Sequence, residues 1–411
     1  MTIANCVIVG GGPAASAAAA ALRSAGYDGA LTLISAEHVA PYERPPLSKD
    51  FLTGATTAAD LQLRRPDWYA EQGVVLRLGT RVAAIDTAGQ AVVLGDGERV
   101  GYDRVLIATG GRPRRLPGIE SDRILYLRDL ADAQALAERL TPGEPLVVMG
   151  AGFIGCEVAA AARKLGVDVT VLEQAEVPLQ RIVGKEVGEV VAAIHRDHGV
   201  ALRTGETVES VDATGDRVLV TTDRGRLECA SLVVAIGLVP ATDLAVGTDI
   251  AVDGANGGIA VDGCCRTSAP NVYAAGDVAS QHYLRYDRRI RVEHHDNAVK
   301  QGAAAARNML GSGETYDDPH WFWSDQYEHS LQSIGRGDGC DQTVVRGSLA
   351  DRSFSVFSLA SGRVRGVFAI DRGTDILAGK RLIQSGAAVD PRLLADESVN
   401  LKRLVVAERS R

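Results

Sequence analysis

Short unbroken runs of apolar residues, each followed by a polar or glycine-rich turn, recur along much of the chain. Residues 7–9 and 31–34 are the first two such runs, and residues 146–149 and 168–172 repeat the arrangement later. A helical pattern rich in alanine lies between the members of each pair. Buried parallel strands have this texture, and a strand–helix–strand unit of about 30 residues has the length of a βαβ element. The pattern therefore predicts two βαβ units.

Two further apolar runs, residues 105–109 and 232–236, each end at glycine and close the two predicted units. The texture changes after residue 319, where aromatic residues appear and apolar residues begin to alternate with polar ones. Alternation over residues 354–359 and 364–370 predicts antiparallel strands, and residues 376–384 follow as a helix.

The order of these elements predicts an α/β fold with two doubly wound, Rossmann-like nucleotide-binding domains, one inserted in the other, and a C-terminal α+β domain. Proline and glycine mark the changeovers near residues 112 and 240. The predicted bounds are 1–112 with 241–319 for the first domain, 113–240 for the second and 320–411 for the third.

Composition narrows the class of protein. A chain of 411 residues is long enough for two or three domains, and 46% apolar with 23% charged residues is typical of a globular enzyme. The net charge of −8 argues against nucleic acid as a partner. No apolar run is long enough to span a membrane, and no signal segment is recognised, so we expect a cytoplasmic protein. The six cysteines have no metal-ligand spacing, and we expect no metal site.

Both glycine-rich turns follow a predicted strand and open a predicted helix. In such a turn the first glycine permits the tight bend, the second lets the backbone approach a pyrophosphate, and the third position allows close packing of helix on strand. The helix start then offers unpaired N–H groups to the phosphates. The residues concerned are Gly10, Gly12 and Ala15 in the first turn and Gly150, Gly152, Ile154 and Gly155 in the second.

An acidic residue follows the second strand of each unit. Glu37 and Glu173 can accept hydrogen bonds from the ribose hydroxyls of an adenosine, and a carboxylate at Glu173 would repel the 2′-phosphate of NADPH. A third strand ends in Gly276-Asp277, whose carboxylate can meet a ribityl hydroxyl of a flavin. These signals assign FAD to the first turn and NADH to the second.

Several longer strings carry a family resemblance. They are residues 41–49 (PYERPPLSK), the Ala108-Thr-Gly segment, Gly276-Asp277 and residues 321–327 (WFWSDQY). Over its whole length the chain resembles the FAD-dependent ferredoxin reductases of bacterial oxygenase systems, in the pyridine nucleotide-disulphide oxidoreductase superfamily. The last string is more specific to that family than the glycine turns.

The resemblance implies roles for particular residues. It places Lys49 and Glu157 as an ion pair beside the flavin, where a lysine could stabilise negative charge as hydride arrives. The role of His295 and its neighbour His294 stays open. The implied FAD contacts are Ala15, Glu37, Arg44, Lys49, Val82, Arg128, Asp277 and His295.

A missing cysteine pair decides where the electrons go. Disulfide reductases of this plan use cysteines in the stretch corresponding to residues 43–50, and this chain has none there. Electrons should therefore leave the flavin directly, one at a time. The resemblance implies that the acceptor is a [2Fe–2S] ferredoxin that feeds an oxygenase or cytochrome P450. Trp323 is the candidate for covering the flavin edge, with Trp321 as second choice.

The electron acceptor remains open at this level. A rubredoxin reductase or an NADH oxidase would differ only in its acceptor. A redox-signalling flavoprotein of the apoptosis-inducing-factor type shares the architecture, but it carries a basic face and targeting segments. Ferredoxins are usually acidic, so we expect docking on a basic rim formed by Arg285, Arg288, Arg289 and Arg291. The oligomeric state is not predicted.

Overall fold

The computed structural model describes residues 3–65 and 67–404. Contacts divide the chain into two compact units, each assembled from three separate segments. The first unit contains the chain up to Arg44, Ala58–Arg112 and Leu238–Asp318. The second contains Pro45–Thr57, Pro113–Gly237 and the chain from Pro319 onward. The segments predicted to be the NAD-binding and C-terminal domains thus belong to one unit.

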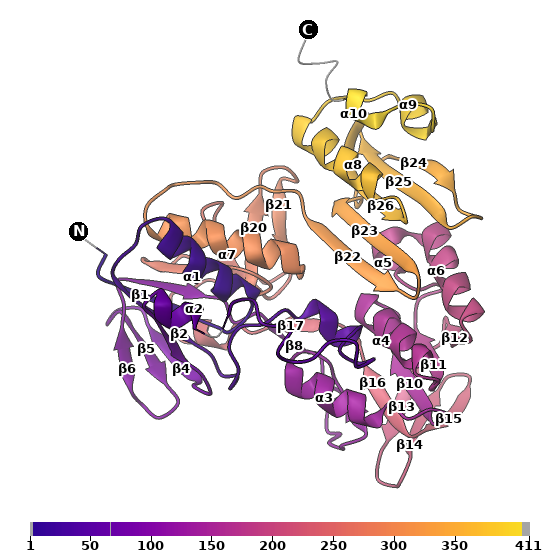
Figure 1. The fold of residues 1–411 in the computed structure, drawn as a ribbon, viewed down its shortest axis with the longest axis horizontal. Coiled ribbons are helices and arrows are strands. Elements are labelled where there is room, and N and C mark those ends of the chain that lie inside the picture. Colours follow the sequence, from indigo (N-terminus) through magenta and orange to yellow (C-terminus); the bar gives the residue numbers. More distant parts are fainter. Residues whose placement is uncertain (1–2, 66, 405–411) are drawn as a thin grey trace. The chain divides into compact units, whose positions relative to one another are not determined.

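A five-stranded parallel sheet forms the centre of the first unit (Figure 1). Neighbouring residues of its middle strand enter different cores: Cys6 and Ile8 pack on one face, Val7 and Val9 on the other. This alternation follows from the pleat of a strand, and a strand buried on both faces has to be apolar throughout. In order across the sheet the strands are β19 (Val272–Ala274), β7 (Arg104–Ile107), β1 (Asn5–Val9), β2 (Ala30–Ile34) and β3 (Val74–Arg77).

Helices α1 (Pro13–Ser24) and α7 (His295–Met309) pack side by side against one face of this sheet (Figure 1). They approach so closely that a Cβ at Gly302 would collide with the backbone of Ala14. The abundance of alanine in both helices therefore has a packing reason. The short α2 (Trp68–Glu71) adds Tyr69 to the same core.

Two small sheets complete the first unit, and their apolar residues share a core with the other face of the parallel sheet. One is antiparallel and contains β4 (Val82–Asp86), β5 (Ala91–Leu94) and β6 (Arg99–Gly101). The other contains β18 (Ile259–Val261), β20 (Ala279–Tyr283) and β21 (Arg288–Arg291). Short connecting elements are β8 (Gly111–Pro113), β17 (Leu238–Pro240) and η2 (Asp243–Ala245).

The second unit, like the first, contains a five-stranded parallel sheet. Its parallel sheet has the order β12 (Ala201–Thr204), β11 (Asp168–Glu173), β10 (Pro145–Met149), β16 (Ser231–Val234) and β9 (Ile124–Leu125). The helices are α3 (Leu130–Arg139), α4 (Phe153–Lys164), α5 (Gln180–Val183) and α6 (Lys185–Asp197). A three-stranded antiparallel sheet contains β13 (Val208–Asp212), β14 (Val218–Thr222) and β15 (Gly225–Cys229).

An antiparallel sheet near the C-terminus completes the second unit, in the order β22 (Trp321–Gln326), β23 (His329–Gly335), β26 (Arg363–Ile370), β25 (Ser353–Ala360) and β24 (Gln342–Ser348). Helix α8 (Gly373–Ser385) packs on β23 and β26 (Figure 1), so closely that a Cβ at Gly379 would collide with Val367. The shorter α9 (Pro391–Ala395) and α10 (Leu401–Leu404) follow, and η1 (Pro45–Ser48) joins the unit from the first part of the chain.

The predicted fold class is confirmed. Both parallel sheets carry the strand–helix–strand units that the apolar runs predict, and the alternating residues 354–359 and 364–370 lie in β25 and β26. Helix α8 contains the predicted helix, residues 376–384, and extends beyond it by three residues at the N-terminal end and one at the C-terminal end. No helix within residues 3–65 and 67–404 is long and apolar enough to cross a membrane.

Candidate functional site

The first glycine turn joins β1 to α1. Gly10 has a φ of +132°, and a Cβ there would collide with the carbonyl of Ala108. Gly12 caps α1 without a side-chain hydrogen bond, and no acidic residue lies in the first turn of the helix. Ala15 is fully buried inside that turn. The start of α1 therefore offers backbone N–H groups and open space to an anionic group, which fits the pyrophosphate of a dinucleotide.

Glu37, just beyond β2, is held by two neighbours. Arg44 donates to Glu37 Oε1 over 2.5 Å, and the Tyr42 hydroxyl donates to Oε2 over 2.6 Å. The guanidinium of Arg44 also lies 5.2 Å from the centre of the Tyr42 ring. Each carboxylate oxygen has a second lone pair, so Glu37 can still accept from a ribose. Arg44 therefore fixes the carboxylate within the first unit.

Asp277 and the start of α7 are positioned by a network of buried amides that the sequence did not indicate. The Gly276 N–H donates to Gln301 Oε1 over 2.8 Å, and Gln301 donates onward to Gln281 over 2.9 Å. The Gly276 φ of +79° favours glycine at this bend. His295 is the first residue of α7, and burial lowers its pKa.

The second glycine turn joins β10 to α4 with the same geometry. Gly150 has a φ of +103°, and a Cβ at Gly155 would collide with the Gly150 carbonyl, so both positions need glycine. Gly152 caps α4 without a side-chain hydrogen bond. Ile154, at the second position of the helix, is 46% exposed, an uncommon environment for a large apolar side chain.

Glu173, the last residue of β11, is aligned with this turn. Its Oε2 accepts from the Ala151 N–H over 2.7 Å, and its Oε1 accepts from the Ala175 N–H over 2.8 Å. Two backbone donors thus fix the carboxylate in one orientation, with lone pairs left for two further donors. Glu173 can therefore accept hydrogen bonds from two hydroxyl groups of a ligand.

Lys49, Glu157 and Trp323, the three candidate catalytic residues, lie together within the second unit. The Lys49 ammonium is 3.5 Å from Glu157 Oε1 and 3.4 Å from Asp325 Oδ2. It also lies 5.5 Å from the centre of the Trp323 ring, and Trp321 stacks on Trp323 with ring centres 4.9 Å apart. Three segments far apart in the sequence therefore meet around one lysine.

Glu157 is the fifth residue of α4 and only 7% exposed. Burial raises the pKa of its carboxyl, while Lys49 and two serine hydroxyls act in the opposite direction. Ser324 Oγ donates to Glu157 Oε1 over 2.6 Å, and Ser48 donates to Oε2. Both serines lie in strings that carry the family resemblance, residues 41–49 and 321–327, but sequence analysis gave neither serine a role because their contacts with Glu157 span 109 and 167 residues.

The remaining predicted FAD contacts are distributed over both units. Val82 begins β4 and Ala108 follows β7, both in the first unit. Arg128 and Lys49 belong to the second unit, where Arg128 immediately precedes Asp129, the residue that caps α3.

The four predicted docking arginines lie in the β20–β21 hairpin. Arg285 and Arg291 form ion pairs with nearby carboxylates, and Arg289 donates to backbone carbonyls of β18 and β20. Arg288 is exposed, and Leu284, at the hairpin tip, is 71% exposed. The basic surface is therefore smaller than the count of arginines suggests.

All six cysteines are unpaired. Cys156, beside Glu157 on α4, is fully buried, and burial raises the pKa of its thiol. A thiol in this state is a poor nucleophile. No dithiol is therefore available near the candidate catalytic residues.

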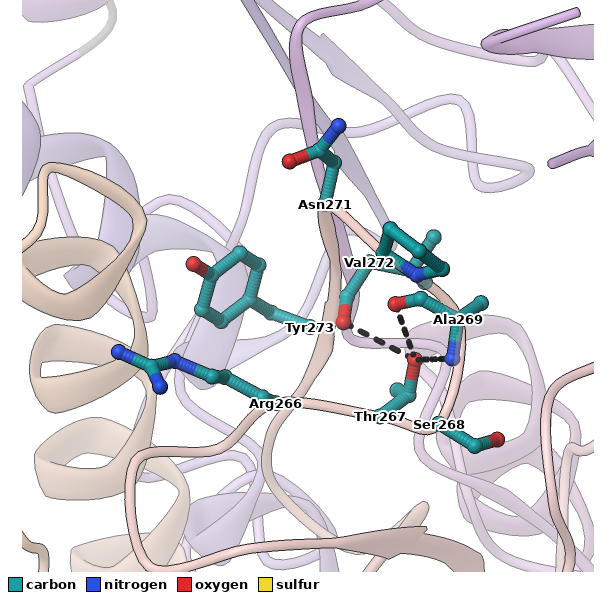
Figure 2. A pocket seen from close by; sticks show the side chains of 8 residues that line it. Arg266, Thr267, Ser268, Ala269, Asn271, Val272 and Tyr273 are labelled. Carbon is teal, nitrogen blue, oxygen red and sulfur yellow. Dashed lines mark hydrogen bonds between the residues drawn. The ribbon is translucent and has the colours of Figure 1, made fainter. Parts of the chain in front are cut away.

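A shallow hollow of about 140 Å³ lies in the first unit, at the turn from Arg266 to Tyr273 (Figure 2). It contains none of the predicted site residues. The Thr267 hydroxyl interacts with backbone atoms of Ala269 and Val272 and so stabilises the turn. The hollow is a feature of the turn that leads into β19.

Two family models match the chain. The pyridine nucleotide-disulphide oxidoreductase model matches residues 4–302, and the reductase C-terminal model matches residues 321–405. The chain belongs to the pyridine nucleotide-disulphide oxidoreductases. The family that the sequence motifs indicate is thereby confirmed.

Individual members of this oxidoreductase family resemble the chain over its full length. Putidaredoxin reductase of Pseudomonas putida is 40% identical over 99% of this chain and 98% of its own. The ferredoxin–NAD(+) reductase component of the anthranilate 1,2-dioxygenase system of Burkholderia cepacia is 41% identical over 96% and 98%. The crystal structure of the covalent putidaredoxin reductase–putidaredoxin complex matches with a TM-score of 0.95 and 39% identity over 99% of each chain.

His195, buried on α6, leads to a prediction for stability in acid. Burial lowers the pKa of its imidazole to about 4, against about 6.5 in an unfolded chain. Between these values the unfolded state binds a proton that the folded state excludes, so stability present above pH 6.5 is lost as the pH falls towards 4. From pH 7 to pH 5, chemical denaturation should show a loss of unfolding free energy about 2 kcal/mol larger for the unaltered protein than for His195→Gln. Equal losses in the two proteins would contradict the assignment.

Proposed function

We propose that this protein is an NADH-dependent ferredoxin reductase, which passes electrons from NADH through FAD to a [2Fe–2S] ferredoxin. The observation that carries the proposal is the meeting of Lys49, Glu157 and Trp323 in a unit without any cysteine pair. Two nucleotide-binding turns supply the places for two dinucleotides, and the relatives include reductases of oxygenase systems. Unpaired thiols agree with a reducing compartment, and we assign the protein to the cytoplasm.

FAD, when bound, accepts a hydride and releases its two electrons singly. In our proposal the start of α1 binds its pyrophosphate, Glu37 accepts from its adenosine ribose, and Asp277 meets its ribityl chain. Arg44 keeps the Glu37 carboxylate oriented. The remaining proposed contacts are Gly10, Gly12, Ala15, Val82, Ala108, Arg128, Lys49 and His295.

NADH binds, in this proposal, at the second turn. The start of α4 takes the pyrophosphate, and Glu173 accepts from both hydroxyls of the adenosine ribose. Because Ala151 and Ala175 hold the carboxylate in place, Glu173 cannot turn away from a 2′-phosphate without losing two hydrogen bonds. This rigidity favours NADH over NADPH.

Lys49 contributes a fixed positive charge where electron density accumulates during hydride transfer. Glu157 and Asp325 hold the ammonium from two sides, and the Trp323 ring lies beside it. A charge that is already oriented needs no reorganisation at the moment of reaction. Trp323 shields this position from water.

The decisive experiment is reduction of cytochrome c by NADH with purified protein, with and without added [2Fe–2S] ferredoxins. Strict dependence on one ferredoxin supports the proposal. Equal rates with a rubredoxin would make the protein a rubredoxin reductase, and rapid oxygen consumption without any carrier would make it an NADH oxidase. A bound flavin that NADH reduces only to a long-lived complex would indicate a signalling role.

The ferredoxin would dock, in this proposal, near the β20–β21 hairpin, where Arg288 and Leu284 are exposed. Reversing Arg288 and Arg289 to glutamate should lower kcat/KM for an acidic ferredoxin by about tenfold at low ionic strength, because electrostatic steering raises association rates by one to three orders of magnitude. The effect should shrink in high salt. Reduction of ferricyanide should not change.

A matched control reverses two other exposed arginines of the same unit, Arg65 and Arg99. This double variant has the same net charge as the hairpin variant. If both variants slow ferredoxin reduction equally, the effect is one of net charge and the hairpin is not the docking surface.

A further inference from the structure

A line of four hydrogen bonds within the second unit leads from Tyr327, through His195 on α6, to the buried carboxylate of Glu157. The Tyr327 hydroxyl is 3.1 Å from His195 Nδ1, and His195 Nε2 is 3.0 Å from Gln326 Oε1. Gln326 Nε2 donates to Ser324 Oγ over 3.0 Å, and Ser324 Oγ donates to Glu157 Oε1 over 2.6 Å. His195, Gln326, Ser324 and Glu157 are all buried. We refer to Tyr327, His195, Gln326 and Ser324 as the polar chain.

The polar chain has one direction. The carboxylate has no proton to give, so the single hydroxyl proton of Ser324 must point at Glu157. The amide of Gln326 then donates to Ser324 and accepts from His195, which requires the imidazole proton on Nε2. His195 Nδ1 is consequently an acceptor for the Tyr327 hydroxyl, and the ring is neutral, as its lowered pKa requires. Every donor points towards Glu157.

Aligned hydrogen bonds of this kind polarise one another and stabilise the negative charge at their end. Glu157 needs that support, because burial disfavours its charged form and the Lys49 ammonium is 3.5 Å away rather than in short contact. The Ser48 hydroxyl supports the second carboxylate oxygen. A neutral Glu157 would lose its attraction for Lys49.

We infer that Ser324, Gln326 and His195 are positioning residues, which keep Glu157 ionised and oriented so that Glu157 in turn holds Lys49 for hydride transfer. The inference rests on the proposed function for its last step only. None of the three residues needs to touch a nucleotide. Their effect passes through Glu157.

The charged and titratable groups near Glu157 come from three segments. Lys49 faces it from the segment after η1, and Asp325 of β22 acts through its contact with Lys49. On α4 itself Cys156 is adjacent, and its buried thiol stays protonated. His195 reaches Glu157 only through Gln326 and Ser324.

The test compares Ser324→Ala with the unaltered holoprotein. Removing a hydrogen bond to a charged group should favour the neutral carboxyl by about tenfold or more. The rate constant for reduction of bound FAD by NADH, measured by stopped flow, should therefore fall at low pH, where Glu157 protonates, by up to about tenfold. It should recover as the pH rises, since Glu157 ionises again. Infrared difference spectra between low and high pH should show the carboxylic acid band of Glu157 at higher pH than in the unaltered protein, with Glu157→Gln identifying the band.

Ser355→Ala is the matched control. Ser355 is also a buried serine of the C-terminal sheet, and its hydroxyl donates to a buried carboxylate, that of Asp375, over 2.8 Å. It has no part in the polar chain. Tyr327→Phe, at the far end of the chain, removes one hydroxyl and should change the rate constant by about twofold in the same direction, because cooperative effects along such chains are modest. This variant serves if Ser324→Ala does not fold.

A Ser324→Ala variant with the pH profile and infrared band of Ser355→Ala would overturn the inference. Full recovery at high pH together with a shifted band would support it, and an equal loss of rate at every pH would mean a merely structural role. If NADH fails to reduce the flavin of the unaltered protein, the proposed function is wrong. The infrared band would still report whether the polar chain keeps Glu157 ionised.

Discussion

Replacing Lys49 with methionine should slow the reduction of bound FAD by NADH by about 100- to 1,000-fold, the usual loss when one preorganised electrostatic group is removed from a reaction centre. Methionine keeps the length and apolar stem of the side chain but not its charge. Glu157 would then be buried without its counter-charge and would take up a proton. Stopped-flow absorbance of the flavin measures the rate constant directly.

Lys185→Met controls for the loss of a lysine ion pair. Lys185 lies in the same unit, at the start of α6, and its ammonium is 2.7 Å from Glu176 on the exposed surface. This variant should reduce FAD at the normal rate. Equal rates in Lys49→Met and Lys185→Met would remove Lys49 from the mechanism, and NADH titration would confirm that both variants still bind the nucleotide.

Replacing Glu173 with alanine should weaken NADH binding by about 10- to 100-fold, the range for hydrogen bonds to a charged group. The loss should be smaller for NADPH, because the substitution also removes a negative charge that repels the 2′-phosphate. The ratio of the dissociation constants for NADPH and NADH, measured on the same preparation, should therefore be smaller in the variant than in the unaltered protein. KM for NADH in the cytochrome c assay should rise in parallel.

Glu176→Ala is the control for Glu173→Ala, since Glu176 lies three residues further on and is exposed in an ion pair with Lys185. Nucleotide binding should not change in this variant. An unchanged KM for NADH in Glu173→Ala would mean that the carboxylate only organises the turn through Ala151 and Ala175.

Features that depend on neighbouring residues could be predicted from the sequence. The two glycine turns with Glu37 and Glu173 are local patterns, because strand, turn and helix must follow one another within a βαβ unit. The requirement for glycine at positions 10, 150 and 155 agrees with the backbone of the structure. The antiparallel strands 354–359 and 364–370 could also be predicted, because apolar and polar residues alternate along them.

Features that depend on distant segments could not be predicted in this way. Lys49 and Glu157 were paired through the family resemblance, since nothing local connects them. Ser324 lies in the family string 321–327 and His195 lies in no motif, but neither local sequence indicates the distant partner. A buried polar residue on an amphipathic element looks the same in sequence as one facing water. The sequence shows how many arginines the β20–β21 hairpin contains. It does not show that two of them form ion pairs with carboxylates.

The segment Pro45–Thr57 has a practical consequence for engineering. It groups with the second unit although it lies between two stretches of the first, and it contributes Ser48 and Lys49 to the surroundings of Glu157. A chimera that exchanges only residues 113–237 for those of a homologue would therefore combine a foreign Glu157 with native partners. Grafts intended to change nucleotide preference should carry 45–57 and 319–411 along, so that the lysine and its carboxylate descend from the same parent.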